Sequence, residues 1–132
     1  MNWSASALSH DREAQDYVNE SLAALPANAV VLADGDRQTF ALWYARWGIS
    51  GSFRGEVVSL PLLQFDWYRA QVQARNPALK LPPAASSGEI FLTQFVAANL
   101  DARPIFLTTD AHSAGDGFAL QPAGPLFKVQ KK

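Results

Sequence analysis

The chain is predicted to fold as an α/β domain: a three-layer Rossmann-like arrangement with a mostly parallel sheet, helices on both faces and a C-terminal edge hairpin. Three observations predict it. Short, continuous apolar runs are typical of strands that are buried on both faces. Stretches with helical spacing of apolar residues lie between these runs, and this alternation is typical of parallel sheets. Two short strand patterns around a Pro-Ala-Gly-Pro turn then close the chain.

Length and composition limit the class of protein. The chain has 132 residues, the size of one domain, and we expect residues 1–132 to form a single unit with residues 1–10 as an amino-terminal arm. Hydrophobic residues make up 48% and charged residues 17%, which excludes an intrinsically disordered chain. The net charge of −1 argues against nucleic acid as a partner. There is no cysteine, which excludes disulfides and thiolate metal sites.

The first half of the chain reads as two helix–strand units. Apolar residues at helical spacing predict a helix over residues 11–25, and the run Asn-Ala-Val-Val-Leu-Ala predicts a buried strand over residues 28–33. Phe40, Trp43, Tyr44 and Trp47 share one face of a second predicted helix. This helix is predicted over residues 37–47. The sequence Glu-Val-Val-Ser-Leu predicts the next strand over residues 56–60.

The second half adds two helices, a strand and the hairpin. Residues 61–65 read as a linker, after which Asp66 is placed to cap a helix. Ser86 and Glu89 have capping-box spacing for another helix, whose predicted inner face carries Phe91, Gln94, Phe95 and Ala98. The predicted bounds are residues 66–75 and 86–100 for the helices, residues 105–108 for the strand, and residues 118–121 and 126–130 for the hairpin.

The predicted topology brings three polar segments together. We expect the first strand to lie between the second and the third, with the hairpin at one edge. Ligands of open parallel sheets bind beyond the carboxyl ends of the strands, where residues 34–37, 61–68 and 108–112 should meet. The candidate ligand-binding residues in these segments are Asp34, Asp36, Arg37, Gln64, Asp66, Trp67, Asp110 and His112. We predict no cofactor and assign no catalytic or metal-ligating residue.

The turn Asp34-Gly35-Asp36 has several possible roles. Gly35 permits a positive φ angle, and Asp36 is placed to cap the following helix. Two carboxylates at the amino end of a helix repel phosphate, so the turn is no phosphate cradle. Its oxygens suit a divalent cation or sugar hydroxyls, and a purely structural turn is an equal alternative. The haloacid-type phosphatase pattern is disfavoured because Gln38 stands where that pattern has Thr or Val.

The aromatic residues admit two interpretations. Trp43, Tyr44, Trp47, Trp67 and Tyr68 have faces on which the C–H groups of a sugar can pack, with neighbouring carboxylates binding the hydroxyls. Helical spacing favours burial against the sheet for most of them.

Four segments, in this order, resemble a family of bacterial multi-pass membrane proteins related to transmembrane O-mannosyltransferases of the GT-C type. They are Asp-Gly-Asp-Arg-Gln-Thr-Phe-Ala-Leu-Trp-Tyr at residues 34–44, Val-Val-Ser-Leu-Pro-Leu-Leu at residues 57–63 with Asp-Trp-Tyr at 66–68, Arg-Pro-Ile-Phe at 103–106, and Gly-Pro-Leu-Phe-Lys-Val at 124–129. The chain departs from the family pattern at Arg37 and Gln38, where the family has Asn-Asp, and at Ala41, where it has Pro.

This resemblance implies a location and a role. The region follows the transmembrane helices in such proteins, so the chain is expected to be a carboxyl-terminal domain on the periplasmic or extracellular side. Its expected partners are the transmembrane portion of the same protein and a glycan or protein acceptor. The catalytic acid of GT-C enzymes lies near the membrane, so the domain is expected to bind or position an acceptor without catalysing transfer. The alternatives are a small metal-dependent enzyme that uses Asp34, Asp36 and Asp110, and a protein-interaction module.

Overall fold

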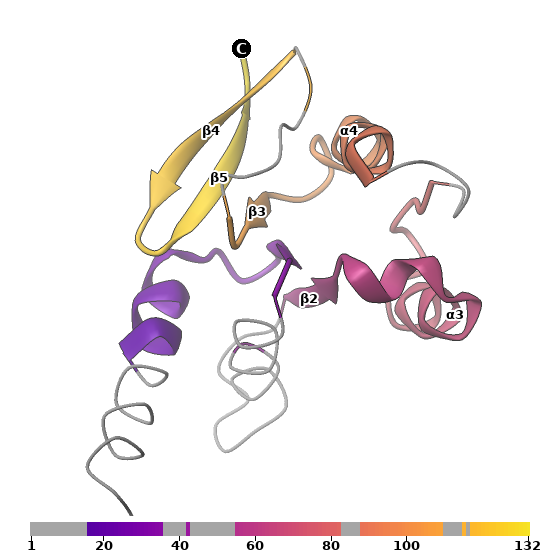
Figure 1. Cartoon of the computed structure of the whole chain (residues 1–132). Coiled ribbons are helices and arrows are strands. Elements are labelled where there is room, and N and C mark those ends of the chain that lie inside the picture. Colours follow the sequence, from indigo (N-terminus) through magenta and orange to yellow (C-terminus); the bar gives the residue numbers. More distant parts are fainter. Residues whose placement is uncertain (1–15, 36–41, 43–54, 83–87, 110–114, 116) are drawn as a thin grey trace, which may run out of the picture.

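The computed structural model describes residues 16–35, 42, 55–82, 88–109, 115 and 117–132 (Figure 1). The predicted arm at residues 1–10 and nearly all of the predicted helix at residues 37–47 lie outside these residues. The strands are β1 Val30–Ala33, β2 Glu56–Ser59, β3 Ile105–Leu107, β4 Phe118–Ala123 and β5 Leu126–Lys131. The helices are residues 16–24, the 3-10 helix η1 Pro61–Gln64, α3 Asp66–Arg75 and α4 Gly88–Asn99.

The strands form one mixed sheet in the order β2-β1-β3-β5-β4. β1 runs parallel to β2 and β3, which confirms its predicted place between them. The hairpin occupies the edge of the sheet opposite β2, and its inner strand β5 is antiparallel to β3. β4 and β5 are also antiparallel, because the tight turn between them reverses the chain directly, whereas a parallel pair would need a long crossover.

The α/β class is therefore confirmed, and the finer fold prediction is not. Two of the strand pairings are antiparallel, so the sheet is mixed rather than mostly parallel. The helices in the described part of the chain are few, and they do not establish a three-layer Rossmann-like fold.

The alternation of side chains along β1 divides the core into two parts. Val30 and Leu32 point to the face that α3 and α4 cover, where Tyr68 and Phe95 are also buried. Val31 and Ala33 point to the opposite face, which the helix at residues 16–24 contacts through Tyr17 and Leu22. Figure 1 shows α3 and α4 on one side of the sheet and the helix at residues 16–24 next to the hairpin. Every residue of β1 is buried, as its continuous apolar run predicts.

Residues 61–65, which the sequence predicts to be a linker, form the 3-10 helix η1 and its junction with α3. Pro61 stands in the first turn of η1, where its missing N–H breaks no helical hydrogen bond. Phe65 is extended, ends η1 and precedes α3. The predicted capping role of Asp66 is wrong: Asp66 is the first helical residue, and no side chain caps α3. Its carboxylate still lies where the helix dipole favours a negative charge.

The buried face of α4 differs from the predicted one. Phe91 and Phe95 are buried as predicted, but Gln94 and Ala98 are exposed. Leu92 and Val96 are buried instead, because these larger apolar side chains remove more surface from water. Asn99 ends the helix in a buried position. Its amide binds the backbone of residue 80 through Oδ1 and Nδ2, both at 2.9 Å.

Candidate functional site

Backbone hydrogen bonds join the carboxyl ends of the three parallel strands. The N–H of Leu60, just after β2, donates to the carbonyl oxygen of Ala33 at 2.9 Å. The N–H of Thr108, just after β3, donates to Leu32 at 3.2 Å. The Thr108 hydroxyl in turn accepts from the N–H of Asp34 at 3.0 Å. The described parts of the first and third predicted segments therefore contact each other through Asp34 and Thr108, and the second predicted segment begins directly after Leu60.

The turn after β1 has the backbone that its glycine predicts. Gly35 has a φ of 138°, a conformation that side-chain-bearing residues rarely adopt. Asp34 is half-buried beside it. Four of the predicted site residues lie outside the described part of the chain, and the structure does not place them. They are Asp36, Arg37, Asp110 and His112.

The other predicted residues, Gln64, Asp66 and Trp67, lie together at the junction of η1 and α3, and all three are exposed. Trp67 keeps 56% of its surface exposed and Phe65 keeps 44%. The two rings are stacked, with 6.2 Å between their centroids and 20° between their planes. Among the described residues, these two are the large hydrophobic side chains that face water. Exposed apolar surface of this kind marks a candidate binding position.

Tyr68 packs against the ring of Trp67 from the protein interior. It is buried, and its ring meets that of Trp67 edge to face at 5.8 Å and 81°. Its hydroxyl accepts a hydrogen bond of 2.8 Å from the N–H of Ser59, the last residue of β2. Burial raises the pKa of Tyr68 above its ordinary value, although the Ser59 hydrogen bond and the charge of Arg75 act in the opposite direction. The phenol therefore stays neutral at physiological pH and fixes the amino end of α3 to the sheet.

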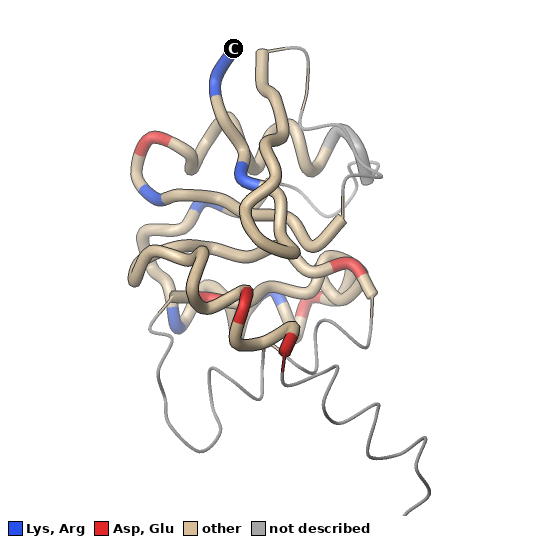
Figure 2. Tube along the Cα trace, turned by 90° about the vertical axis from the view of Figure 1, so that its left-hand side faces the viewer, with Lys and Arg blue, Asp and Glu red and all other residues tan. Residues whose placement is uncertain are grey.

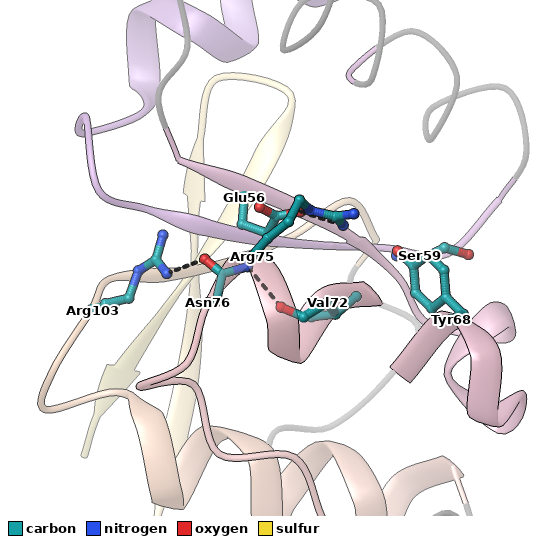
Figure 3. A network of polar contacts seen from close by, with 7 residues as sticks. All are labelled: Glu56, Ser59, Tyr68, Val72, Arg75, Asn76 and Arg103. Atoms are coloured by element: carbon teal, nitrogen blue, oxygen red, sulfur yellow. Dashed lines mark hydrogen bonds and ion pairs between the residues drawn. The ribbon is translucent and has the colours of Figure 1, made fainter. Parts of the chain in front are cut away.

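The opposite end of the sheet holds a buried carboxylate. Glu56, at the start of β2, is only 4% exposed. Its Oε1 accepts from Arg75 at the end of α3, at 3.1 Å from Nε and 2.8 Å from Nη2 (Figure 3). A buried carboxylate needs such a partner because an unpaired charge in the interior is strongly destabilising.

Arg103 extends this polar network to the loops before β1 and β3. Its Nε donates to the carbonyl oxygen of Asn28 at 2.8 Å, and its Nη1 donates to Oδ1 of Asn76 at 3.0 Å. Burial lowers the pKa of Arg103, and the charge of Glu56 partly restores it. Figure 3 shows this group well apart from Ser59 and Tyr68. The network satisfies groups within the protein, so we assign it a structural role.

Charges of both signs are spread over the molecule. Figure 2 shows acidic and basic positions along the described trace, with a basic segment at the carboxyl terminus. No three His, Asp or Glu residues of the described ranges gather as a metal site would require. The prediction of a site with Asp34, Asp36 and Asp110 stays a prediction, because two of its members lie outside those ranges.

Two contributors to the site were missing from the sequence-based selection. The sequence pattern places Phe65 in a linker and Thr108 at the end of a strand. The signal for Phe65 was its position two residues before Trp67, and the structure stacks the two rings. The role of Thr108 depends on a contact with Asp34, 74 residues away along the chain, and no local pattern indicates it.

Comparison with known proteins identifies the family. The family model described as TMEM260-associated domain 2 matches residues 14–90, which is more than half of the chain. The chain belongs to the TMEM260-associated domain 2 family. The matched region of this domain includes β1, β2, η1 and α3, and with them the exposed aromatic pair. Searches of the curated proteins and of the solved structures returned no match.

The family name associates this domain with a TMEM260-related protein. In the ranges that the structure describes, no helix of the domain combines the length and the apolar character that crossing a bilayer requires. The relationship to bacterial O-mannosyltransferases stays an expectation from the resemblance of the four sequence segments.

Proposed function

We propose that this chain is an extracytoplasmic accessory domain of a membrane glycosyltransferase-like protein, where it binds or positions the acceptor and does not itself catalyse transfer. The observation that carries the proposal is the exposed, stacked pair of Phe65 and Trp67 at the carboxyl-end side of the parallel strands. Binding sites of open α/β sheets are found at this end. An exposed aromatic pair supplies contact area without needing a catalytic group beside it.

Two further considerations support the membrane setting. The family is named for its association with TMEM260, and the match includes the strands and the helix that build the aromatic pair. The four sequence segments that resemble the GT-C-related family occur here in the same order, and two of them lie at the end of β1 and at the η1–α3 junction. The transmembrane portion of the same protein is accordingly the proposed partner, and the periplasm or cell exterior is the proposed location.

Transfer kinetics test the accessory role. In the membrane polypeptide that contains this domain, Trp67→Ala should raise the KM for the acceptor and leave kcat nearly unchanged, because the ring contributes to binding and not to the chemical step. Trp67→Phe keeps a ring and should retain most of the affinity. Lys128→Ala, an exposed change on β5, is the matched control. A fall in kcat at constant KM, or transfer catalysed by the 132-residue chain alone, would contradict the proposal.

Labelling tests the location. The 132-residue chain has no cysteine, so Lys132→Cys adds one exposed thiol to this domain, and the membrane polypeptide without the substitution is the control for thiols elsewhere. A membrane-impermeant maleimide should label this thiol in intact cells that express the membrane polypeptide. Labelling that requires cell lysis would place the domain in the cytoplasm and overturn the proposed location.

A further inference from the structure

We propose that the surface formed by Gln64, Phe65, Asp66 and Trp67 binds a neutral sugar unit, which stacks on the aromatic rings while the amide and the carboxylate bind its hydroxyls. This inference rests on the proposed function, since it names the chemical class of the acceptor. The four residues are consecutive and span the end of η1 and the start of α3. We call them the aromatic platform.

The rings provide the apolar half of such a site. The rings are stacked, with 20° between their planes and 6.2 Å between their centroids, so together they form one apolar unit with ring surface left open to water. About half of each side chain is exposed, 44% for Phe65 and 56% for Trp67. A pyranose ring carries axial C–H groups on one face, and this face packs on an aromatic surface of that size.

The platform is held in place before any ligand arrives. The edge of Trp67 packs against Tyr68, and the hydroxyl of Tyr68 is bound to the backbone of Ser59. On the other side of α3, the guanidinium of Arg69 donates to the carbonyl oxygens of Leu63 and Pro82. These contacts fix the η1–α3 junction to the sheet and to the following loop. A site that is already ordered loses less entropy when it binds a ligand.

The polar half consists of the side chains that alternate with the rings. Gln64 and Asp66 are exposed, and within the described ranges neither side chain makes a hydrogen bond or an ion pair. The amide can donate and accept, and the carboxylate accepts strongly. Together with the rings they match the two kinds of surface that a sugar presents, C–H faces and hydroxyls.

The same residues disfavour other ligands. The Asp66 carboxylate repels phosphate and anionic lipid headgroups, and the nearest guanidinium in sequence, that of Arg69, is bound to backbone oxygens. A stable protein partner needs about 20–30 residues a side. The platform itself consists of four residues, with Phe65 and Trp67 as its apolar part, which is the size of a sugar unit and not of such an interface. A single sugar unit is matched in size and in charge.

Nuclear magnetic resonance of the 132-residue chain tests the proposal. The chain has four tryptophans, so the indole N–H of Trp67 is assigned by its loss in Trp67→Phe. The probes are methyl glycosides and linear oligosaccharides of mannose, glucose, galactose and xylose. At least one of them should shift the Trp67 resonance in a saturable way at concentrations up to about 20 mM, a range suited to millimolar affinity.

The variants give the expected pattern. Both substitutions at Trp67 remove this indole, so binding by these variants is measured from saturable shifts of the backbone amide resonances. Trp67→Ala should weaken the binding about tenfold or more, and Trp67→Phe should stay within about threefold of the parent chain, because the ring face supplies the contact. Asp66→Asn, which keeps the shape and lowers the acceptor strength, should weaken it by a smaller factor. Lys128→Ala should leave it unchanged.

Two results would overturn the sugar assignment. One is a Trp67 resonance that no oligosaccharide shifts, and the other is equal binding by the parent chain and Trp67→Ala. A Trp67 resonance that responds to phosphatidylglycerol vesicles or to an unglycosylated acceptor peptide, but to no oligosaccharide, would also overturn the sugar assignment. If the sugar assignment fails while Trp67→Ala still raises the KM for the acceptor, the accessory role stands and the acceptor is recognised by another chemistry.

Discussion

The hydroxyl of Tyr68 accepts a hydrogen bond of 2.8 Å from the backbone N–H of Ser59, and this bond connects the first turn of α3 to the last residue of β2. Both residues are buried, so water cannot replace either partner. The bond also fixes the ring on which the edge of Trp67 packs. One buried contact therefore contributes to the stability of the sheet edge and to the position of the exposed ring.

Removing this hydroxyl should destabilise the protein. Tyr68→Phe keeps the ring in the core but leaves the buried N–H of Ser59 without its acceptor, so the free energy of unfolding should fall by about 1–3 kcal/mol. Urea denaturation followed by circular dichroism measures the change. Tyr17→Phe is the matched control, because the buried Tyr17 hydroxyl faces only the Ser21 hydroxyl among the described residues and makes no hydrogen bond of good geometry with it. Equal losses in the two variants would show that the Ser59 bond contributes nothing.

Stability should fall at alkaline pH. Burial raises the pKa of Tyr68 above 10.0 in the folded protein, so above about pH 10 the unfolded chain loses this proton more readily than the folded one. The folded state then binds more protons than the unfolded state, and the free energy of unfolding decreases as the pH rises. Below about pH 10 the contribution is constant. Urea titrations on both sides of that pH should show a shallower decrease for Tyr68→Phe; an unchanged slope would contradict the raised pKa.

Local sequence patterns were sufficient for elements whose partners lie next to them in the chain. The predicted bounds of α3 agree with the structure, and the strand with the continuous apolar run is central and buried. Gly35 has the positive φ that its place in the turn predicts. The predicted buried face of α4 was right at Phe91 and Phe95 and wrong at positions 94 and 98. The helical period was applied without regard to side-chain size, and Leu92 and Val96 remove more apolar surface from water.

Contacts between residues far apart in the sequence determine the features that local patterns did not predict. The antiparallel contact of β5 with β3 depends on where the hairpin docks. The ion pair of Glu56 with Arg75 joins the two ends of a strand–helix unit that the sequence shows only as separate charges. Trp67 and Tyr68 are neighbours in sequence, yet one is exposed and the other is buried, because adjacent helical residues point about 100° apart.

Replacing a buried hydroxyl in the first helix should stabilise the protein. Ser21 is fully buried in the helix at residues 16–24. Its hydroxyl faces that of Tyr17 one turn earlier but makes no hydrogen bond of good geometry with a described residue. Ser21→Ala removes an unsatisfied polar group and introduces the strongest helix former, so the free energy of unfolding should rise by about 1 kcal/mol. Ser21→Gly also removes the hydroxyl but should not stabilise, since glycine disfavours helix. Thermal unfolding of the three proteins gives the order, and a loss of stability in Ser21→Ala would mean that the hydroxyl has a partner.

The turn of the hairpin should not tolerate a side chain at Gly124. This glycine has a φ of 61°, and a Cβ atom there would lie 3.2 Å from the carbonyl oxygen of Glu20 and 3.6 Å from Cβ of Ala24. Gly124→Ala therefore strains the backbone and crowds the helix against which the turn lies, and it should lower the free energy of unfolding by about 1–2 kcal/mol. Gly117→Ala is the control, because a Cβ atom at Gly117 meets nothing within 4 Å and its φ is not positive. Urea denaturation should show a change within about 0.5 kcal/mol for Gly117→Ala. Equal effects of the two substitutions would mean that the turn does not pack on the helix as described.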